Sequence, residues 1–221
     1  MIITDHIVYE DDVILVINKP AGLMVEPDRN NNPSLLQHVK EYLKKTLAPG
    51  TELYAQHIHR IDRPVSGIVL FAKQRAVLKN LSEQFAERKV KKFYRALTAQ
   101  APEKLQGRLE HWHRKEKKKA VLYDYEIEYS ERAVLDYTII KVSENKFLWE
   151  IELHTGKYHQ IRAQLASLNC PILGDEKYGS LLAYKPDTIA LEASRLIFHH
   201  PVNAKSMDIQ LTDTLNHDQG T

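Results

Sequence analysis

The chain contains little cysteine and no long apolar run. Cys170 is the single cysteine among 221 residues, which excludes an intramolecular disulfide and any zinc site built on paired thiolates. Early acidic residues occupy the N-terminal stretch, where no basic region precedes an apolar segment, so we expect neither a signal peptide nor a membrane span. These features predict a cytoplasmic protein in which Cys170 is an inert buried thiol.

The sequence also lacks the loops that usually hold nucleotide cofactors. Neither GxGxxG nor GxxxxGK[ST] occurs, so no dinucleotide or nucleoside triphosphate cradle is predicted. Eleven histidines, some paired in HIH, HWH and HH, raise the alternative of a metal-dependent hydrolase. Because there is no HExxH helix and no thiolate partner, we favour structural histidines over metal ligands. We therefore expect neither a metal nor a cofactor.

Charge is nearly balanced overall but unevenly distributed. Thirty-one Lys and Arg against twenty-nine Asp and Glu leave a net charge of +2, which does not by itself indicate nucleic acid. Residues 87–95 and 113–119 concentrate cations, and the first stretch includes Phe93 and Tyr94. Such stretches can neutralise phosphates while an aromatic ring stacks on a base. Taken alone, either stretch is more typical of a solvated helix end or hairpin tip.

Strand-like and helix-like patterns alternate along the chain without a regular βαβ spacing. With 43% hydrophobic residues, a chain of this length can bury a core and form one domain. Short apolar or alternating runs predict strands, and apolar residues at helical spacing predict helices. The expected strands are 13–18, 68–73, 93–97, 137–142, 147–153, 189–201 and 206–211, and the expected helices 34–47, 77–85 and 155–168, the last capped by Thr155. The mixture predicts an α+β fold with a mixed, largely antiparallel sheet.

A single acid among cations stands out in HRIDRPVSG, residues 59–67. Asp62 lies between Arg60 and Arg63, and two neighbouring guanidinium groups favour the ionised carboxylate. A glycosidase would need a second, cooperating carboxylate. One ionised acid instead suits a nucleophile or a general base, and half of a structural salt bridge is the alternative.

Five motifs follow one another along the chain. They are NKPAGL at 18–23, HRIDRPVSGIVLFAK at 59–73, KFY at 92–94, TGKYHQIR at 155–162 and PILGDEKYG at 171–179. In this order they closely resemble the RluA-type family of RNA pseudouridine synthases, from about Ile7 to Pro201. The resemblance implies isomerisation of uridine in RNA, no cofactor, and a sheet bisected by a catalytic cleft and flanked by helices and loops.

The resemblance also implies roles for individual residues. It makes Asp62 the catalytic aspartate, Tyr94 the tyrosine that packs against the target uracil, and Arg162 the arginine that pairs with the catalytic carboxylate. Ile161 becomes an apolar wall of the uracil pocket, and Arg60 the arginine that enters the RNA where the target nucleotide has left. Further RNA contacts are expected from Lys19, His59, Lys92, Lys157 and His159.

The chemistry agrees with these residue types. The reaction breaks the N1–C1′ bond of uridine and joins C1′ to C5, so nothing is gained from outside. An ionised carboxylate can attack C1′ or remove the 2′ proton, and the sequence leaves both routes open. The target nucleotide must leave the stack, at a cost of roughly a few kcal/mol.

Three positions depart from the usual pattern of the family. Ile61 replaces a leucine, Val65 a threonine and Lys157 an arginine. The lysine keeps the charge but loses the planar, bidentate guanidinium. These changes affect the expected RNA contacts and leave the three proposed catalytic groups in place.

The motifs begin too early for the S4-type RNA-binding domain that many relatives carry. We therefore expect one catalytic domain over residues 1–221, with its core at about 7–201 and a frayed tail at about 215–221, acting as a monomer. The substrate is left open between tRNA and rRNA. A non-catalytic RNA-binding module on the same fold is the alternative to an enzyme.

Overall fold

The computed structural model describes residues 1–30, 32–212 and 215, which form two compact units. Unit 1 comprises Met1–Val90 and Arg195–Leu211, and unit 2 comprises Lys91–Ser194 and the residues described after Leu211. A single catalytic domain stays a prediction. Apart from the buried Leu215, the predicted frayed tail lies outside the described residues. None of the helices in these ranges is long and apolar enough to cross a membrane.

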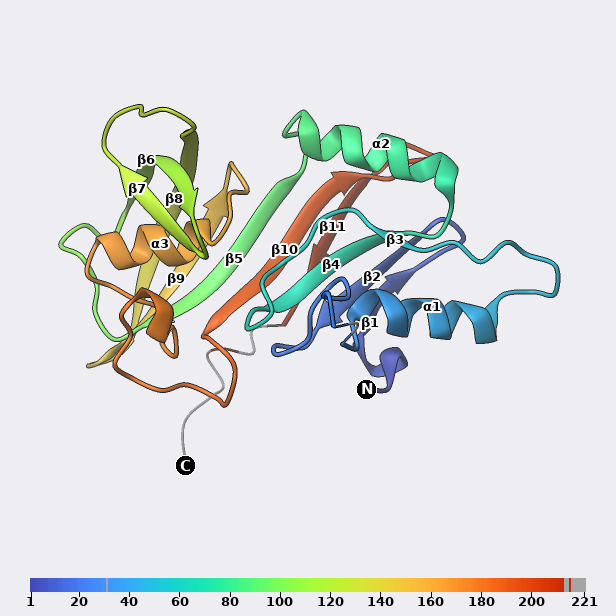
Figure 1. Cartoon of the computed structure of the whole chain (residues 1–221), viewed down its shortest axis with the longest axis horizontal. Coiled ribbons are helices and arrows are strands. Elements are labelled where there is room, and N and C mark those ends of the chain that lie inside the picture. The colour runs from blue at the N-terminus through green and yellow to red at the C-terminus, as the bar shows by residue number, and fades with distance from the viewer. Residues whose placement is uncertain (31, 213–214, 216–221) are drawn as a thin grey trace. The chain divides into compact units, whose positions relative to one another are not determined.

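Unit 1 consists of strands flanked by two α-helices (Figure 1). Its elements are η1 (Ile3–His6), β1 (Ile7–Glu10), β2 (Ile14–Lys19), α1 (Leu35–Thr46), β3 (Gln56–His57), β4 (Ser66–Ala72), α2 (Arg75–Ala86), residues 195–199 of β10 (Leu191–His199), and β11 (Ser206–Gln210). The strand order is β1-β2-β4-β10, with β3 also pairing with β4 and β11 with β10. Side chains from β2, β4, β10 and α2 share one hydrophobic core.

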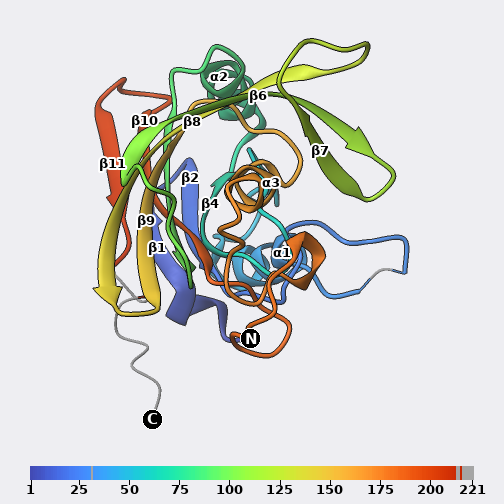
Figure 2. The same ribbon diagram turned by 90° about the vertical axis from the view of Figure 1, so that its left-hand side faces the viewer.

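Unit 2 is a sheet of long strands with one short α-helix. Its elements are β5 (Lys91–Thr98), β6 (Gln106–Glu116), β7 (Lys119–Tyr123), β8 (Glu131–Ser143), β9 (Lys146–Leu153), α3 (Gln160–Ser167), η2 (Glu176–Tyr178) and residues 191–194 of β10. The strand order is β5-β9-β8-β6-β7. Figure 2 shows the β6–β7 hairpin with α3 beside β7. The buried Trp149 of β9 anchors this sheet, and its indole N–H donates to Thr98 Oγ1 at 2.7 Å.

The predicted α+β class is confirmed, and so are the elements on which it rested. Strands β2 and β4 coincide with the predicted apolar runs, and β8 and β9 form the predicted antiparallel hairpin. A parallel bridge joins Met24 to Ser34, so the pairing is mixed but largely antiparallel. The expected strands did not include β1, β3, β6 or β7. Strand β3 has only two residues, too few to show an alternating pattern.

The predicted cap of the third helix is wrong. Helix α3 begins at Gln160, with His159 in the N-cap position at a left-handed φ of 52°. The Thr155 hydroxyl accepts from Val134 N at 2.8 Å and donates to Gln160 Oε1 at 2.8 Å. Thr155 therefore joins the start of the helix to β8 and does not cap the helix itself.

Ser34 forms a capping box with Gln37 at the start of α1. Gln37 Oε1 accepts from Ser34 N at 2.9 Å, and Ser34 Oγ accepts from Gln37 N at 3.4 Å. Because Ser34→Ala leaves that N–H without its acceptor, we expect it to lower the free energy of unfolding by about 1 kcal/mol in urea denaturation. The matched control is Thr46→Ala at the other end of α1, for which we expect a change within about 0.5 kcal/mol. Equal effects of the two substitutions would contradict the capping role.

Candidate active site

Asp62 lies in the loop between β3 and β4, and this loop is fastened to the end of β2. The Gly22 N–H donates to the Arg63 carbonyl oxygen at 2.7 Å, and Arg63 Nε donates back to the Gly22 carbonyl oxygen at 3.0 Å. Gly22 has a φ of +84°, which glycine adopts without steric cost. The Val65 N–H donates to the Asp62 carbonyl oxygen at 3.1 Å and closes the turn. The NKPAGL and HRIDRPVSG motifs are thus joined in one local structure.

Lys19 supplies a buried amino group to this structure. Its Nζ donates to the carbonyl oxygens of Pro20 at 2.9 Å, Leu23 at 2.7 Å and Arg63 at 3.3 Å. The side chain is fully buried, and this burial lowers the pKa of Lys19 to about 7, against the attraction of the Asp62 carboxylate. An RNA contact of Lys19 stays a prediction, whereas the contacts present in the structure are to the backbone of the Asp62 loop.

The buried Lys19 gives stability a distinct pH dependence. Between about pH 7 and 10.5 the unfolded chain binds a proton at this lysine that the folded chain does not, so the contribution of Lys19 to stability rises with pH. We expect the free energy of unfolding of the wild type, minus that of Lys19→Met, to increase by about 1.4 kcal/mol per pH unit. Urea denaturation at pH 7, 8 and 9 measures this slope. Lys79→Met, which alters an exposed lysine of α2, is the control and should give a flat difference; a flat difference for Lys19→Met as well would refute the assignment.

Arg60 and His59 flank Asp62 in different ways. The Arg60 side chain is exposed and forms an ion pair with Glu26. The His59 ring turns inward, stacks on Phe85 with ring centroids 5.0 Å apart, and accepts from the Leu70 N–H at 3.2 Å. Arg60 therefore has the accessibility that its predicted RNA contact requires, while the contacts of His59 hold the start of the loop against α2 and β4.

In unit 2, Arg162 of α3 forms a buried, bidentate ion pair with Asp175. Its Nε donates to Asp175 Oδ2 at 2.7 Å and its Nη2 to Oδ1 at 2.8 Å, and both side chains are almost completely buried. The guanidinium carbon also lies 5.2 Å from the ring centroid of Tyr178. A guanidinium carries five N–H donors, so the pair with Asp175 is compatible with a second carboxylate partner. Sequence reasoning missed the role of Asp175, although this acid lies in the PILGDEKYG motif.

His159 and Tyr178 form a neutral hydrogen-bonded pair next to Arg162. Burial and the positive charge of Arg162 lower the pKa of His159 to about 3, and burial raises the pKa of Tyr178 to about 12. The Ala120 N–H donates to the Tyr178 hydroxyl at 2.8 Å, and that hydroxyl lies 3.0 Å from His159 Nδ1. With Nδ1 as the acceptor, the ring proton of His159 is on Nε2. Any RNA contact of His159 is thus made by a neutral imidazole.

Tyr94 and Lys92 lie on one face of β5. Tyr94 is half-buried and pairs across the strands with Ile151 of β9. Lys92 is two residues earlier, so its side chain projects to the same side. Its Nζ lies 3.4 Å from the position that a Cβ would take at Gly156, so it reaches the TGKYHQIR segment.

The other two predicted residues differ in accessibility. Lys157 is half-buried and forms an ion pair with Glu131, whereas Ile161 is buried in α3. Asp62 belongs to unit 1, and Tyr94 and Arg162 belong to unit 2. Their convergence, and the pairing of Arg162 with Asp62, stay predictions.

Side chains of the paired histidines contact polar groups or rings of their own units. His57 Nε2 lies 3.7 Å from Glu26, His111 Nδ1 lies 3.1 Å from Gln164 Nε2, and His113 Nε2 lies 2.9 Å from the Tyr158 carbonyl oxygen. Across residues 1–30, 32–212 and 215, no group of three His, Cys, Asp or Glu is placed to hold a metal ion. Cys170 is buried as predicted, and burial raises the pKa of its thiol.

Comparisons with known proteins agree on one family. A family model described as RNA pseudouridylate synthase matches residues 13–167. The ribosomal large subunit pseudouridine synthase D of Zymomonas mobilis is 33% identical, with 92% of this chain and 67% of the relative covered. The synthase C of Rickettsia bellii is also 33% identical, with 95% and 68% covered.

A solved structure supports the fold. Human RNA pseudouridylate synthase domain containing 4 has a TM-score of 0.77 at 23% identity, over 95% of this chain and 89% of that one. The expected pseudouridine synthase fold is therefore confirmed. The motifs and the comparisons together establish that this chain belongs to the RluA-type RNA pseudouridylate synthases, a family of RNA-modifying isomerases.

Proposed function

We propose that this protein converts uridine to pseudouridine in ribosomal RNA, with Asp62 as the group that acts at the ribose. The observation that carries the proposal is the Asp62 loop, which is hydrogen-bonded to the residues that follow β2 and to the buried Lys19 Nζ. The names of the two bacterial relatives, both large-subunit synthases, favour rRNA over tRNA as the substrate class.

The proposed reaction needs one ionised carboxylate and a holder for the detached base. Asp62 attacks C1′ or removes the 2′ proton, and either route breaks the N1–C1′ bond. The uracil then turns and C5 bonds to C1′, which breaks the Asp62–C1′ bond in the first route and is accompanied by return of the proton to C2′ in the second. The hydrogen on C5 leaves as a proton, and N1 gains a proton. Tyr94 supplies an aromatic surface for the uracil during this rotation, and Arg162 pairs with Asp62.

The local structure contributes to this chemistry by holding the proposed reactive groups in a fixed orientation. A reactive group held in one geometry avoids much of the entropic cost of reaching the transition state. The hydrogen bonds between Gly22 and Arg63 and those from Lys19 restrain the backbone on the C-terminal side of Asp62. In unit 2, Asp175 restrains the guanidinium of Arg162 in the same way.

Release of tritium from RNA labelled at C5 of uridine tests the proposal. Because forming the C1′–C5 bond expels the C5 hydrogen, we expect tritium in solvent when the protein acts on unmodified large-subunit rRNA without added cofactor. A tRNA transcript in a parallel reaction should release much less. Binding of both RNAs with no tritium release would contradict the proposal and would favour a non-catalytic RNA-binding module.

A further inference from the structure

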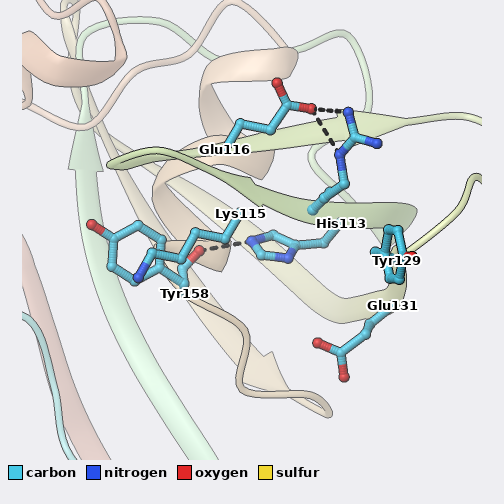
Figure 3. A pocket seen from close by; sticks show the side chains of 7 residues that line it. His113, Lys115, Glu116, Tyr129, Glu131 and Tyr158 are labelled. Atoms are coloured by element: carbon cyan, nitrogen blue, oxygen red, sulfur yellow. Dashed lines mark hydrogen bonds and ion pairs between the residues drawn. The ribbon is translucent and has the colours of Figure 1, made fainter.

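A hollow of ≈ 680 Å³ opens on unit 2 at the β6–β7 hairpin (Figure 3). It is lined by aromatic and charged side chains, namely His113, Arg114, Lys115, Glu116, Tyr129, Glu131 and Tyr158. The volume is ample for one nucleotide. None of these seven residues has a role in the proposed isomerisation.

Tyr129 presents an exposed aromatic ring on a restrained loop. Its relative exposure is 84%, and its φ of 61° is unusual for a residue other than glycine. The Ser130 hydroxyl fastens the loop by accepting from the Ile127 N–H at 3.0 Å and donating to the Ile127 carbonyl oxygen at 2.6 Å. An exposed ring on a loop tied in this way is suited to stacking on a base, because little backbone freedom remains to be lost.

The charges around the hollow are divided between two ends. Glu131 lies with Tyr129 at one end, and Lys115 lies across the Tyr158 ring at the other, its Nζ 4.4 Å from the ring centroid. The remaining pair, Arg114 and Glu116, is joined through Arg114 Nε at 2.9 Å. Glu131 also forms the ion pair with Lys157, and its carboxylate has lone pairs left to accept from a ligand. A ligand in the hollow thus meets an acceptor at one end and a cationic donor at the other.

We propose that this hollow binds an unpaired guanine nucleotide of the RNA substrate. Guanine offers two adjacent donors, N1–H and the N2 amino group, that a carboxylate can accept in parallel, and two acceptors, O6 and N7, that suit a lysine. Among the four bases, guanine alone presents this donor pair to Glu131 while its acceptors face Lys115. Tyr129 stacks on the ring.

Three lysines at the neighbouring hairpin turn indicate that the bound guanine belongs to an RNA chain. Lys117, Lys118 and Lys119 are exposed at the junction of β6 and β7, directly after the lining residues. Cations in this position can contact the phosphates on either side of a bound nucleotide. This step rests on the proposed function, which makes RNA the substrate.

Uridine-free pentaribonucleotides test the site separately from catalysis. We expect fluorescence anisotropy to show that labelled AAGAA binds at least about fivefold more tightly than AAAAA or AACAA, and that unlabelled GMP competes only weakly. Equal affinity for the three pentamers would overturn the preference for guanine, and GMP as tight as AAGAA would overturn the assignment to RNA. Because no uridine is present, tritium release can fail while guanine preference holds, or the reverse, so failures of the two proposals are distinguishable.

Single substitutions assign the preference to the hollow. Loss of a stacking ring should make Tyr129→Ala bind AAGAA roughly 5- to 100-fold more weakly. Glu131→Gln should abolish the preference for AAGAA over AAAAA. The affinity for AAAAA should not fall, because the substitution removes a negative charge and releases Lys157 from its ion pair. Tyr125→Ala is the matched control, since Tyr125 is 70% exposed on the same loop but does not line the hollow. Wild-type affinity in Tyr129→Ala, or an equal loss in Tyr125→Ala, would overturn the site.

Discussion

Asp62→Asn is expected to lower the rate of tritium release from uridine-labelled rRNA by roughly 10⁴- to 10⁶-fold, the scale at which loss of a reactive side chain acts. The amide has the shape of the carboxylate but neither attacks C1′ nor accepts the 2′ proton. RNA affinity should stay within a few-fold of wild type, because the substitution adds no repulsion toward phosphate. Single-turnover kinetics and a filter-binding assay measure the two quantities on one preparation.

The control for Asp62→Asn is the same exchange at an exposed acid of unit 1. Asp12 lies in the turn between β1 and β2 and is exposed. Asp12→Asn should keep full activity. An Asp62→Asn enzyme with activity within tenfold of wild type would remove Asp62 from the chemistry.

Asp175→Ala is expected to lower the free energy of unfolding by about 3–5 kcal/mol, because it removes the carboxylate that pairs with a buried guanidinium. Arg162 and Asp175 have side chains only 6% and 1% exposed, so water cannot replace the lost partner. Activity of the folded fraction should fall as well, since Arg162 loses the contact that fixes its orientation. Urea denaturation measures the first effect, and tritium release at low denaturant the second.

An exposed pair of the same geometry provides the comparison. Arg195 also forms a bidentate pair with an aspartate, Asp208, but here the side chains are 37% and 47% exposed. Solvent screens such pairs, so Asp208→Ala should cost about 0–1 kcal/mol. Similar losses for Asp175→Ala and Asp208→Ala would show that the burial of the Arg162–Asp175 pair has no energetic consequence.

The local sequence pattern was enough to predict the elements that show either a short apolar run or apolar residues at helical spacing. The β2 and β4 runs are apolar on both faces because both faces are buried in unit 1. Helix α1 was predictable from leucine and valine at helical spacing. The start of α3 was not predictable in this way, because the partner that draws Thr155 away from the helix is Val134, 21 residues earlier in the chain.

The candidate site likewise has a part that the sequence predicted and a part that depends on contacts between distant segments. Motif order predicted Asp62 as the catalytic aspartate and indicated the family, and the comparisons confirm the family. The burial of Lys19 and the Arg162–Asp175 pair depend on contacts between segments separated in sequence. A lysine that follows an apolar strand looks like a surface cation in sequence. Its three carbonyl partners appear only when the NKPAGL and HRIDRPVSG loops are folded together.

The most direct test of the central claim is to measure pseudouridine itself. Unmodified large-subunit rRNA would be incubated with the protein without added cofactor, digested to nucleosides and analysed by liquid chromatography with mass spectrometry. We predict that pseudouridine appears as an equal amount of uridine is lost, with no change in the mass of the RNA, and that Asp62→Asn forms none. Uridine unchanged by the wild-type protein, or pseudouridine formed equally well by Asp62→Asn, would contradict the account.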